Sequence, residues 1–165
     1  MLILGLDPGV ESTGYSILKV NGNNSYEALE FDLIKTPNGS EPAMRLYSIY
    51  KKLLKIMTHH KPDTIAIERL FFASNAKTAM RVSQACGVMM LAAARKNLGV
   101  VEYAPGTIKK AVTGNGRADK KDVQKSLRAV FGAKIRSQVH KKTHFDNAAD
   151  ALAVALCHAY TLKNS

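Results

Sequence analysis

The first part of the chain alternates between apolar and polar positions in the manner of β-strands. Short apolar runs at residues 2–6, 14–20 and 26–34 are separated by the turn sequences DPG and NGNN. Apolar runs of this length, bounded by Gly, Pro and Asn, are typical of strands. Residues 2–34 are therefore predicted to form three antiparallel strands joined by short connections.

The rest of the chain alternates between helical patterns and short strands. Apolar side chains recur every three to four positions over residues 44–57, and the apolar run TIAI indicates a strand that ends at Glu68. Ser74 can cap a long helix that extends to about Lys96. The remaining expected elements are a strand at residues 99–103 and helices at residues 107–112, 120–131 and 145–162.

Length and composition indicate one folded domain over residues 1–165. The chain is 46% hydrophobic and 22% charged, which is enough to bury a core. The longest strongly apolar stretch, residues 88–94, is too short to span a membrane, and the first residues lack the basic segment of a signal peptide. Cys86 and Cys157 lie outside any CxxC pair and are expected to be buried free thiols of a cytoplasmic protein.

The formal net charge of +11 is concentrated in one segment. Residues 105–142 contain eleven Lys or Arg against two Asp. A solvated helical face is the ordinary explanation of a charge run, but an excess of this size favours contact with phosphates, because each neutralised phosphate releases counterions. The segment lacks the apolar anchors that a membrane-surface helix needs. Nucleic acid is therefore the expected partner.

Acidic residues stand where their elements begin or end. Asp7 follows the first strand, Glu68 follows the strand at residues 64–67, and Asp146 and Asp150 lie four positions apart at the start of the last helix. If these ends meet at one edge of the sheet, the carboxylates repel one another unless a cation neutralises them. Mg²⁺ prefers such oxygen ligands, and two ions about 4 Å apart can activate water and stabilise the leaving oxygen of a phosphodiester.

Each acidic residue also has an ordinary structural explanation. Asp7 could form a turn, and Asp146 could interact with the helix dipole. Asp150 is harder to explain in this way because it interrupts an apolar helix, and so is Glu68 because it follows an apolar strand. Spacing alone leaves both the metal site and the structural roles open.

Four motifs in order resemble those of the RuvC family of bacterial Holliday junction resolvases. They are LGLDPG followed by TGY, IAIERLFF, GNGRADKK and DNAADALAVALCHAY. The resemblance implies an α/β, RNase H-like fold with a five-stranded mixed sheet flanked by helices. It implies a metal-dependent endonuclease that makes paired symmetric nicks in two strands of like polarity of a four-way junction, leaving 5′-phosphate ends, in homologous recombination and DNA repair. Mg²⁺ is the implied cofactor, with two ions per site and Mn²⁺ able to substitute.

The resemblance also implies roles for individual residues. Asp7, Glu68 and Asp150 match carboxylates that bind metal and take part in catalysis, and Lys109 matches a catalytic lysine. Phe71 matches an aromatic side chain that stacks on unpaired bases. The residues expected to contact DNA are Phe71, Phe72, Lys110, Arg117, Lys120 and Lys121.

The last motif departs from the family pattern at one position. Asn147 stands where well-known members have an Asp or His that binds metal or takes part in catalysis, three positions before Asp150. An amide oxygen can bind a cation, but it carries no charge and cannot act as a base. We therefore expect Asn147 to be the positional equivalent of the fourth ligand, with Asp146 as an alternative ligand.

Partners follow from the same resemblance. Residues 82–94 are apolar almost all round, which one small domain cannot easily cover, and the family forms homodimers through the helix at residues 74–96. Replacing Met89 by Glu is the expected way to weaken that dimer. The branch-migration proteins RuvA and RuvB are implied partners, and the protein is expected to be bacterial and cytoplasmic. No membrane contact is expected, and no use of ATP, because GNG lacks the third glycine of a nucleotide-binding loop.

Two other functions compete with nuclease activity. A junction-binding protein with little or no cleavage would result if Asn147 removed an essential acidic or His residue. An actin-like or sugar-kinase ATPase also opens with Asp-x-Gly after its first strand, although this chain is short and lacks a second phosphate loop. Nicking of a junction in Mg²⁺ or Mn²⁺ distinguishes the resolvase from the binding protein.

Overall fold

The computed structural model describes residues 1–23, 25–69, 76–132, 135 and 142–163, and of residues 142–147 it describes the backbone alone. Its strands are β1 (Leu2–Asp7), β2 (Ser12–Val20), β3 (Tyr26–Lys35), β4 (Thr64–Glu68) and β5 (Val100–Tyr103). Its helices are α1 (Pro42–His60), α2 (Ala76–Arg95), α3 (Pro105–Thr113), α4 (Lys120–Phe131) and α5 (Lys142–Lys163). These elements confirm the predicted alternation, and α1, α3 and α5 extend a few residues beyond their predicted ranges. Ser74, the predicted cap of α2, lies outside the described residues.

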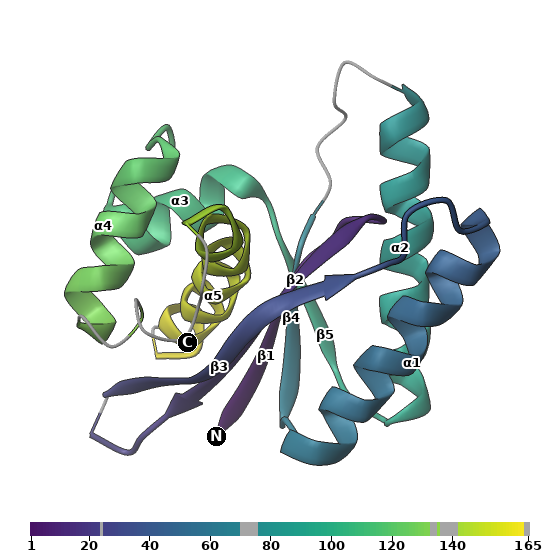
Figure 1. Cartoon of the computed structure of the whole chain (residues 1–165). Helices are drawn as coiled ribbons and strands as arrows, with labels where there is room; N and C mark the ends of the chain where they lie inside the picture. Colours follow the sequence, from purple (N-terminus) through teal and green to yellow (C-terminus); the bar gives the residue numbers. More distant parts are fainter. Residues whose placement is uncertain (24, 70–75, 133–134, 136–141, 164–165) are drawn as a thin grey trace.

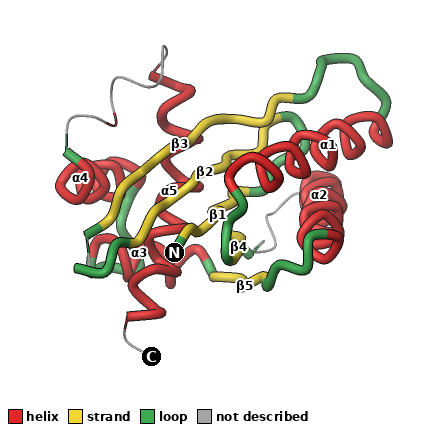
Figure 2. Tube along the Cα trace, turned by 90° about the horizontal axis from the view of Figure 1, so that it is seen from below, coloured by secondary structure: helices red, strands yellow, loops and turns green. Residues whose placement is uncertain are grey.

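The five strands form one mixed sheet in the order β3-β2-β1-β4-β5 (Figure 1). β1, β2 and β3 are antiparallel, whereas β4 runs parallel to β1 and β5 runs parallel to β4. Helices α1 and α2 cover one face of the sheet, and α5 covers the other with α3 and α4 outside it (Figure 2). Each face has its own hydrophobic core, so the sheet is buried between two helical layers.

Helix α5 packs directly against the middle of the sheet. Between residues 148 and 159 nearly all of its side chains are buried, most of them alanines. A Cβ built on Gly5 of β1 would lie 2.3 Å from the carbonyl oxygen of Ala151, so only glycine allows this approach. The buried hydroxyl of Ser16 on β2 donates a hydrogen bond of 2.9 Å to the same oxygen. This close contact sets the distance between α5 and β1.

Helix α2 turns only one side to the sheet. Ala85, Met89, Ala92 and Ala93 are buried in the core, while Leu91 is 62% exposed. Met89, at 1% exposure, is therefore the wrong residue for a test of dimer formation, because its replacement by Glu would place a charge in the core. A helix that is apolar all round does not reveal from its sequence which side faces the sheet.

Two smaller observations complete the fold. Both cysteines are free thiols, but only Cys157 is buried as expected, whereas Cys86 is partly exposed. Within the described residues no helix is long and apolar enough to cross a membrane.

We predict that Gly5→Ala destabilises the protein by about 2 kcal/mol or more, because the new methyl group forces α5 away from β1. Gly99→Ala is the matched control, since its added Cβ meets nothing within 4 Å and its backbone is not left-handed. Urea unfolding of both variants measures the effect. Equal midpoints for the two variants would show that the sheet tolerates a displaced α5.

Candidate active site

Asp7 and Glu68 meet at the edge of the sheet where β1 and β4 both end. Leu6 pairs with Ile67 in the parallel ladder, so the two carboxylates follow at adjacent positions. Ile3 and Ala66 belong to the core beneath α5, and side chains two and four residues apart on a strand share a face. Asp7 and Glu68 therefore both project toward α5, and their side chains form a hydrogen bond.

Helix α5 brings Asp150 to the same place. Asp150 lies one residue before Ala151, whose carbonyl oxygen contacts β1 and β2. The ammonium group of Lys120 donates a hydrogen bond of 2.9 Å to Asp150 Oδ2. Lys120 is the first residue of α4, which begins there because Asp119 and Asp122 form a reciprocal capping box.

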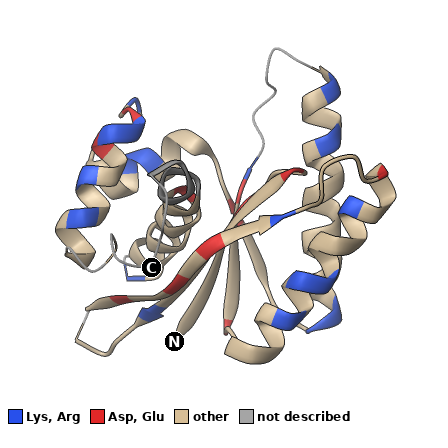
Figure 3. Cartoon of the chain, in the orientation of Figure 1, with Lys and Arg blue, Asp and Glu red and all other residues tan. Residues whose placement is uncertain are grey.

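These groups border a hollow of about 330 Å³ on the α5 side of the sheet. The hollow combines two carboxylates and two ammonium groups with an apolar wall from α3, α4 and α5. Its lining residues are Glu68, Pro105, Ile108, Lys109, Lys120, Val123, Asp150 and Ala153. Lys and Arg recur along α3 and α4, the helices that contribute Lys109 and Lys120 to this hollow (Figure 3).

Burial and mutual repulsion raise the pKa values of the two strand-end carboxyl groups. The pKa of Asp7 rises to about 8, chiefly because the group is buried and also because Glu68 and Asp150 lie close. Burial raises the pKa of Glu68 as well, while its hydrogen bond from Asp7 and the charges of Lys109 and Lys120 oppose the rise. Below about pH 8, Asp7 thus keeps its proton, and its protonated carboxyl group donates a hydrogen bond to Glu68.

This arrangement fits a hard cation chemically. Two carboxyl groups that share one proton can both ionise only when a positive charge takes the proton's place. Among the described side chains no three acidic, His or Cys groups are already arranged around a metal position. Asp7 is hydrogen-bonded to Glu68, and the Lys120 ammonium is paired with Asp150.

The structure brings together some of the predicted residues and leaves others apart. Asp7, Glu68, Asp150, Lys109 and Lys120 converge. The exposed residues that do not line the hollow are Lys110, Arg117 and Lys121. Asp146 and Asn147 lie on the helical backbone of α5 one turn before Asp150, with side chains outside the described set, and Phe71 and Phe72 lie outside the described residues altogether.

A mixed sheet in this order, with acidic residues at the adjacent ends of its two central parallel strands and on the helix across them, defines the class of RNase H-like nucleases. Residues 3–158 match the family model described as crossover junction endodeoxyribonuclease RuvC. The chain belongs to the RuvC family, and it is a structure-selective endonuclease that resolves Holliday junctions. This assignment decides against the ATPase alternative.

Individual relatives agree over nearly the whole chain. The crossover junction endodeoxyribonuclease RuvC of Moorella thermoacetica is 45% identical and covers 96% of this chain and 91% of its own. The enzyme of the same name from Alkaliphilus oremlandii is 44% identical, with 98% and 94% covered. The structure of T. thermophilus RuvC in complex with a Holliday junction substrate has a TM-score of 0.88 at 29% identity, covering 99% of this chain and 96% of that one.

We predict that Asp7→Asn stabilises the metal-free protein increasingly as the pH rises from about 4 to about 8. The folded-state pKa of Asp7 is raised from 3.8 to about 8, so its contribution to stability is complete below pH 4 and is lost as the pH rises to 8. Asn has no charge to bury and escapes this loss. The variant should gain at least about 1.4 kcal/mol relative to the unmodified protein, the equivalent of one pKa unit.

Urea unfolding in EDTA at about pH 5 and about pH 8 measures this difference. A difference in the free energy of unfolding that stays the same at both pH values would show that Asp7 is ionised in the folded protein.

Proposed function

We propose that Asp7, Glu68 and Asp150 hold Mg²⁺, two ions per site, and that the site makes paired symmetric nicks in two strands of like polarity. The supporting observation is that carboxyl groups from β1, β4 and α5 lie close enough to raise the pKa of Asp7, and that Glu68 and Asp150 share one hollow with two lysines. When bound, the cations supply an activated water and charge stabilisation at the leaving oxygen. Hydrolysis that breaks the bond to the 3′ oxygen leaves a 5′-phosphate end.

The two lysines have different tasks in this proposal. Lys109 lines the hollow and its charge lowers the pKa of Glu68, so it keeps that carboxylate ionised and lies where a scissile phosphate would enter. Lys120 neutralises Asp150 in the free protein. A cation on Asp150 would release the Lys120 ammonium, which could then contact the phosphate.

Asn147 tunes this site rather than abolishing it. It lies three residues before Asp150 on α5, on the adjacent turn, as Asp146 does. One charge fewer lowers the attraction for a hard cation. With Asp7, Glu68 and Asp150 all present, nicking is retained and more metal is needed. Asp146 remains the alternative fourth ligand.

DNA lies along the basic surface of α3 and α4 in this proposal. Lys110, Arg117 and Lys121 are exposed beside the hollow and contact backbone phosphates, which position the substrate without reading its sequence. Phe71 and Phe72, which come shortly after Glu68 in the sequence, stack on unpaired bases in this proposal.

A homodimer is formed through the exposed face of α2. Small or flexible side chains recur there every three or four residues, all of them exposed: Ala76, Met80, Ser83, Gly87, Met90 and Ala94. Such spacing is that of two helices packed side by side. Two copies related by a two-fold axis would present two sites to strands of like polarity. RuvA and RuvB as partners, and a cytoplasmic location in a bacterium, belong to the same proposal.

We predict that Met80→Glu combined with Met90→Glu converts the dimer into a monomer, because it places four carboxylates against one another across the two-fold axis. Met44→Glu on α1 is the matched control, since that methionine is 55% exposed on another helix. Light scattering at micromolar concentration measures the mass. An unmodified protein with a mass of 18.0 kDa would contradict the dimer.

We predict that Glu68→Gln abolishes cleavage, with a loss of about a thousandfold or more in rate, while junction affinity changes less than about threefold. The carboxylate binds metal, whereas affinity comes from the lysine-rich surface. Glu102→Gln is the matched control, because Glu102 pairs with Ile67 in the next ladder position of β5 and its exposed side chain projects to the opposite face.

Nicking and gel-shift assays on a four-way junction in Mg²⁺ and Mn²⁺ measure both quantities. Cleavage by Glu68→Gln at the unmodified rate would overturn the site. Tight binding without any nicking by the unmodified protein would instead support a junction-binding protein that Asn147 has made inactive.

A further inference from the structure

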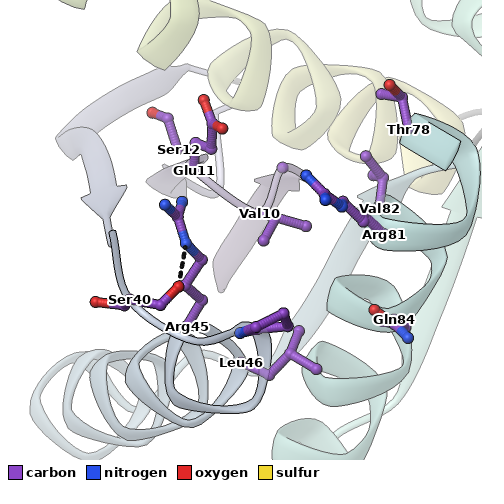
Figure 4. Close-up of a pocket in the computed structure, with 12 residues that line it drawn as sticks. Val10, Glu11, Ser12, Ser40, Arg45, Leu46, Thr78, Arg81, Val82 and Gln84 are labelled. Atoms are coloured by element: carbon purple, nitrogen blue, oxygen red, sulfur yellow. Dashed lines mark hydrogen bonds between the residues drawn. The ribbon is translucent and has the colours of Figure 1, made fainter. Parts of the chain in front are cut away.

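A second, larger hollow lies on the opposite side of the β1–β2 turn from the carboxylates. It has a volume of about 640 Å³ and is formed by that turn, by the start of α1 and by the first half of α2 (Figure 4). Arg45 reaches into it from α1, and Arg81 reaches toward Val10 from α2. Neither the sequence motifs nor the nuclease chemistry described above makes use of this hollow.

The two arginines bring two positive charges to this hollow, against the one negative charge of Glu11. Neither Arg45 nor Arg81 forms an ion pair with a described residue. Arg45 uses two of its N–H groups in hydrogen bonds, from Nε to the Ser40 carbonyl oxygen at 3.3 Å and from Nη1 to Thr36 Oγ1 at 3.2 Å. A guanidinium has five N–H donors. Its position is therefore fixed while donors remain for a ligand.

Further unused donors lie in the same hollow. The hydroxyl oxygen of Ser12 is buried and has no hydrogen-bond partner in the part of the chain that the structure describes. A buried hydroxyl without a partner costs free energy, so a ligand that accepts from it is favoured. Helix α1 begins beside it with Glu41 as its N-cap residue and Pro42 as its first residue, and no side chain caps it. The attraction for an anion in this hollow therefore comes from the two arginines.

The position of this hollow selects which anion binds. Residues 8–11 connect Asp7, at the catalytic end of β1, to Ser12, so the two lie at most about 18 Å apart along the chain. One turn of duplex DNA is about 34 Å long. A DNA arm of one turn that is bound at the carboxylates is longer than this separation, so it can extend to the hollow that Ser12 lines.

We propose that Arg81, Arg45 and Ser12 form a second binding site for a DNA backbone phosphate, which holds the arm on the α1–α2 side of the cleavage position. This inference rests on the proposed function, because it takes the carboxylate hollow as the point of cleavage. The arm is then held by cations on both sides, the α3–α4 surface on one and this arginine pair on the other. Such contacts carry no sequence preference.

Glu11 allows a test in which DNA affinity should change in the opposite direction. Its carboxylate lines the same hollow and repels a phosphate there. Removing the Arg81 charge should weaken DNA binding, whereas removing the Glu11 charge should strengthen it. A purely structural role for these exposed side chains predicts neither change.

The experiment measures binding of a four-way junction in EDTA over a series of salt concentrations. Arg81→Gln should lower affinity roughly threefold to tenfold and reduce the slope of log K against log salt by about 0.9, the value for one phosphate contact. Glu11→Gln should raise affinity about twofold or more. Arg95→Gln is the matched control, because it removes the same charge from the same helix about 21 Å further along its axis.

Each result decides the question. Loss of affinity with Arg81→Gln alone, with the mass by light scattering unchanged, supports the site, and Ser12→Ala should then weaken binding as well. Equal behaviour of Arg81→Gln and Arg95→Gln, or no gain with Glu11→Gln, overturns it. Nicking by the unmodified protein tests the proposed function separately, so the failure of one is distinguishable from the failure of the other.

Discussion

The contact between Gly5 and α5 is the constraint on which the active site depends. Because β1 has no side chain at this position, the backbone of α5 approaches the sheet closely enough for the Ala151 carbonyl oxygen to accept a hydrogen bond from the Ser16 hydroxyl. Asp150 precedes Ala151 and is carried down with it toward Asp7 and Glu68. A bulkier residue at position 5 of β1 would leave the sheet intact but would move Asp150 away from Asp7 and Glu68. Catalytic geometry is here a property of backbone packing, not of the acidic residues alone.

In the metal-free protein, a proton and a lysine take the place of a cation in reducing the negative charge of the site. A proton shared between Asp7 and Glu68 removes one charge, and the Lys120 ammonium compensates another at Asp150. Both substitutes are exchangeable, because a proton and a flexible lysine leave more easily than a buried apolar group. A cation bound to the three carboxyl groups would take the place of both.

Much of this could be predicted from the sequence because the signals were local. Short apolar runs and helical periods predicted the ten helices and strands of the described residues, and acidic residues at strand ends indicated where Asp7 and Glu68 would meet. Two features could not be predicted from a local pattern, because each depends on elements that are remote in the chain. They are the ion pair of Lys120 with Asp150 and the hollow between Arg45 and Arg81. Met89 was misjudged for a related reason, since the side of α2 that faces the sheet is decided by packing.

The three carboxyl groups come from positions 7, 68 and 150, and the last of them lies on the final helix. A chain emerging from the ribosome in order therefore presents the strands β1 to β5 before α5 is available to dock. Until then Asp7 and Glu68 lack their third partner. The carboxylate site of this endonuclease is thus assembled only after the last helix has been synthesised and has packed against β1.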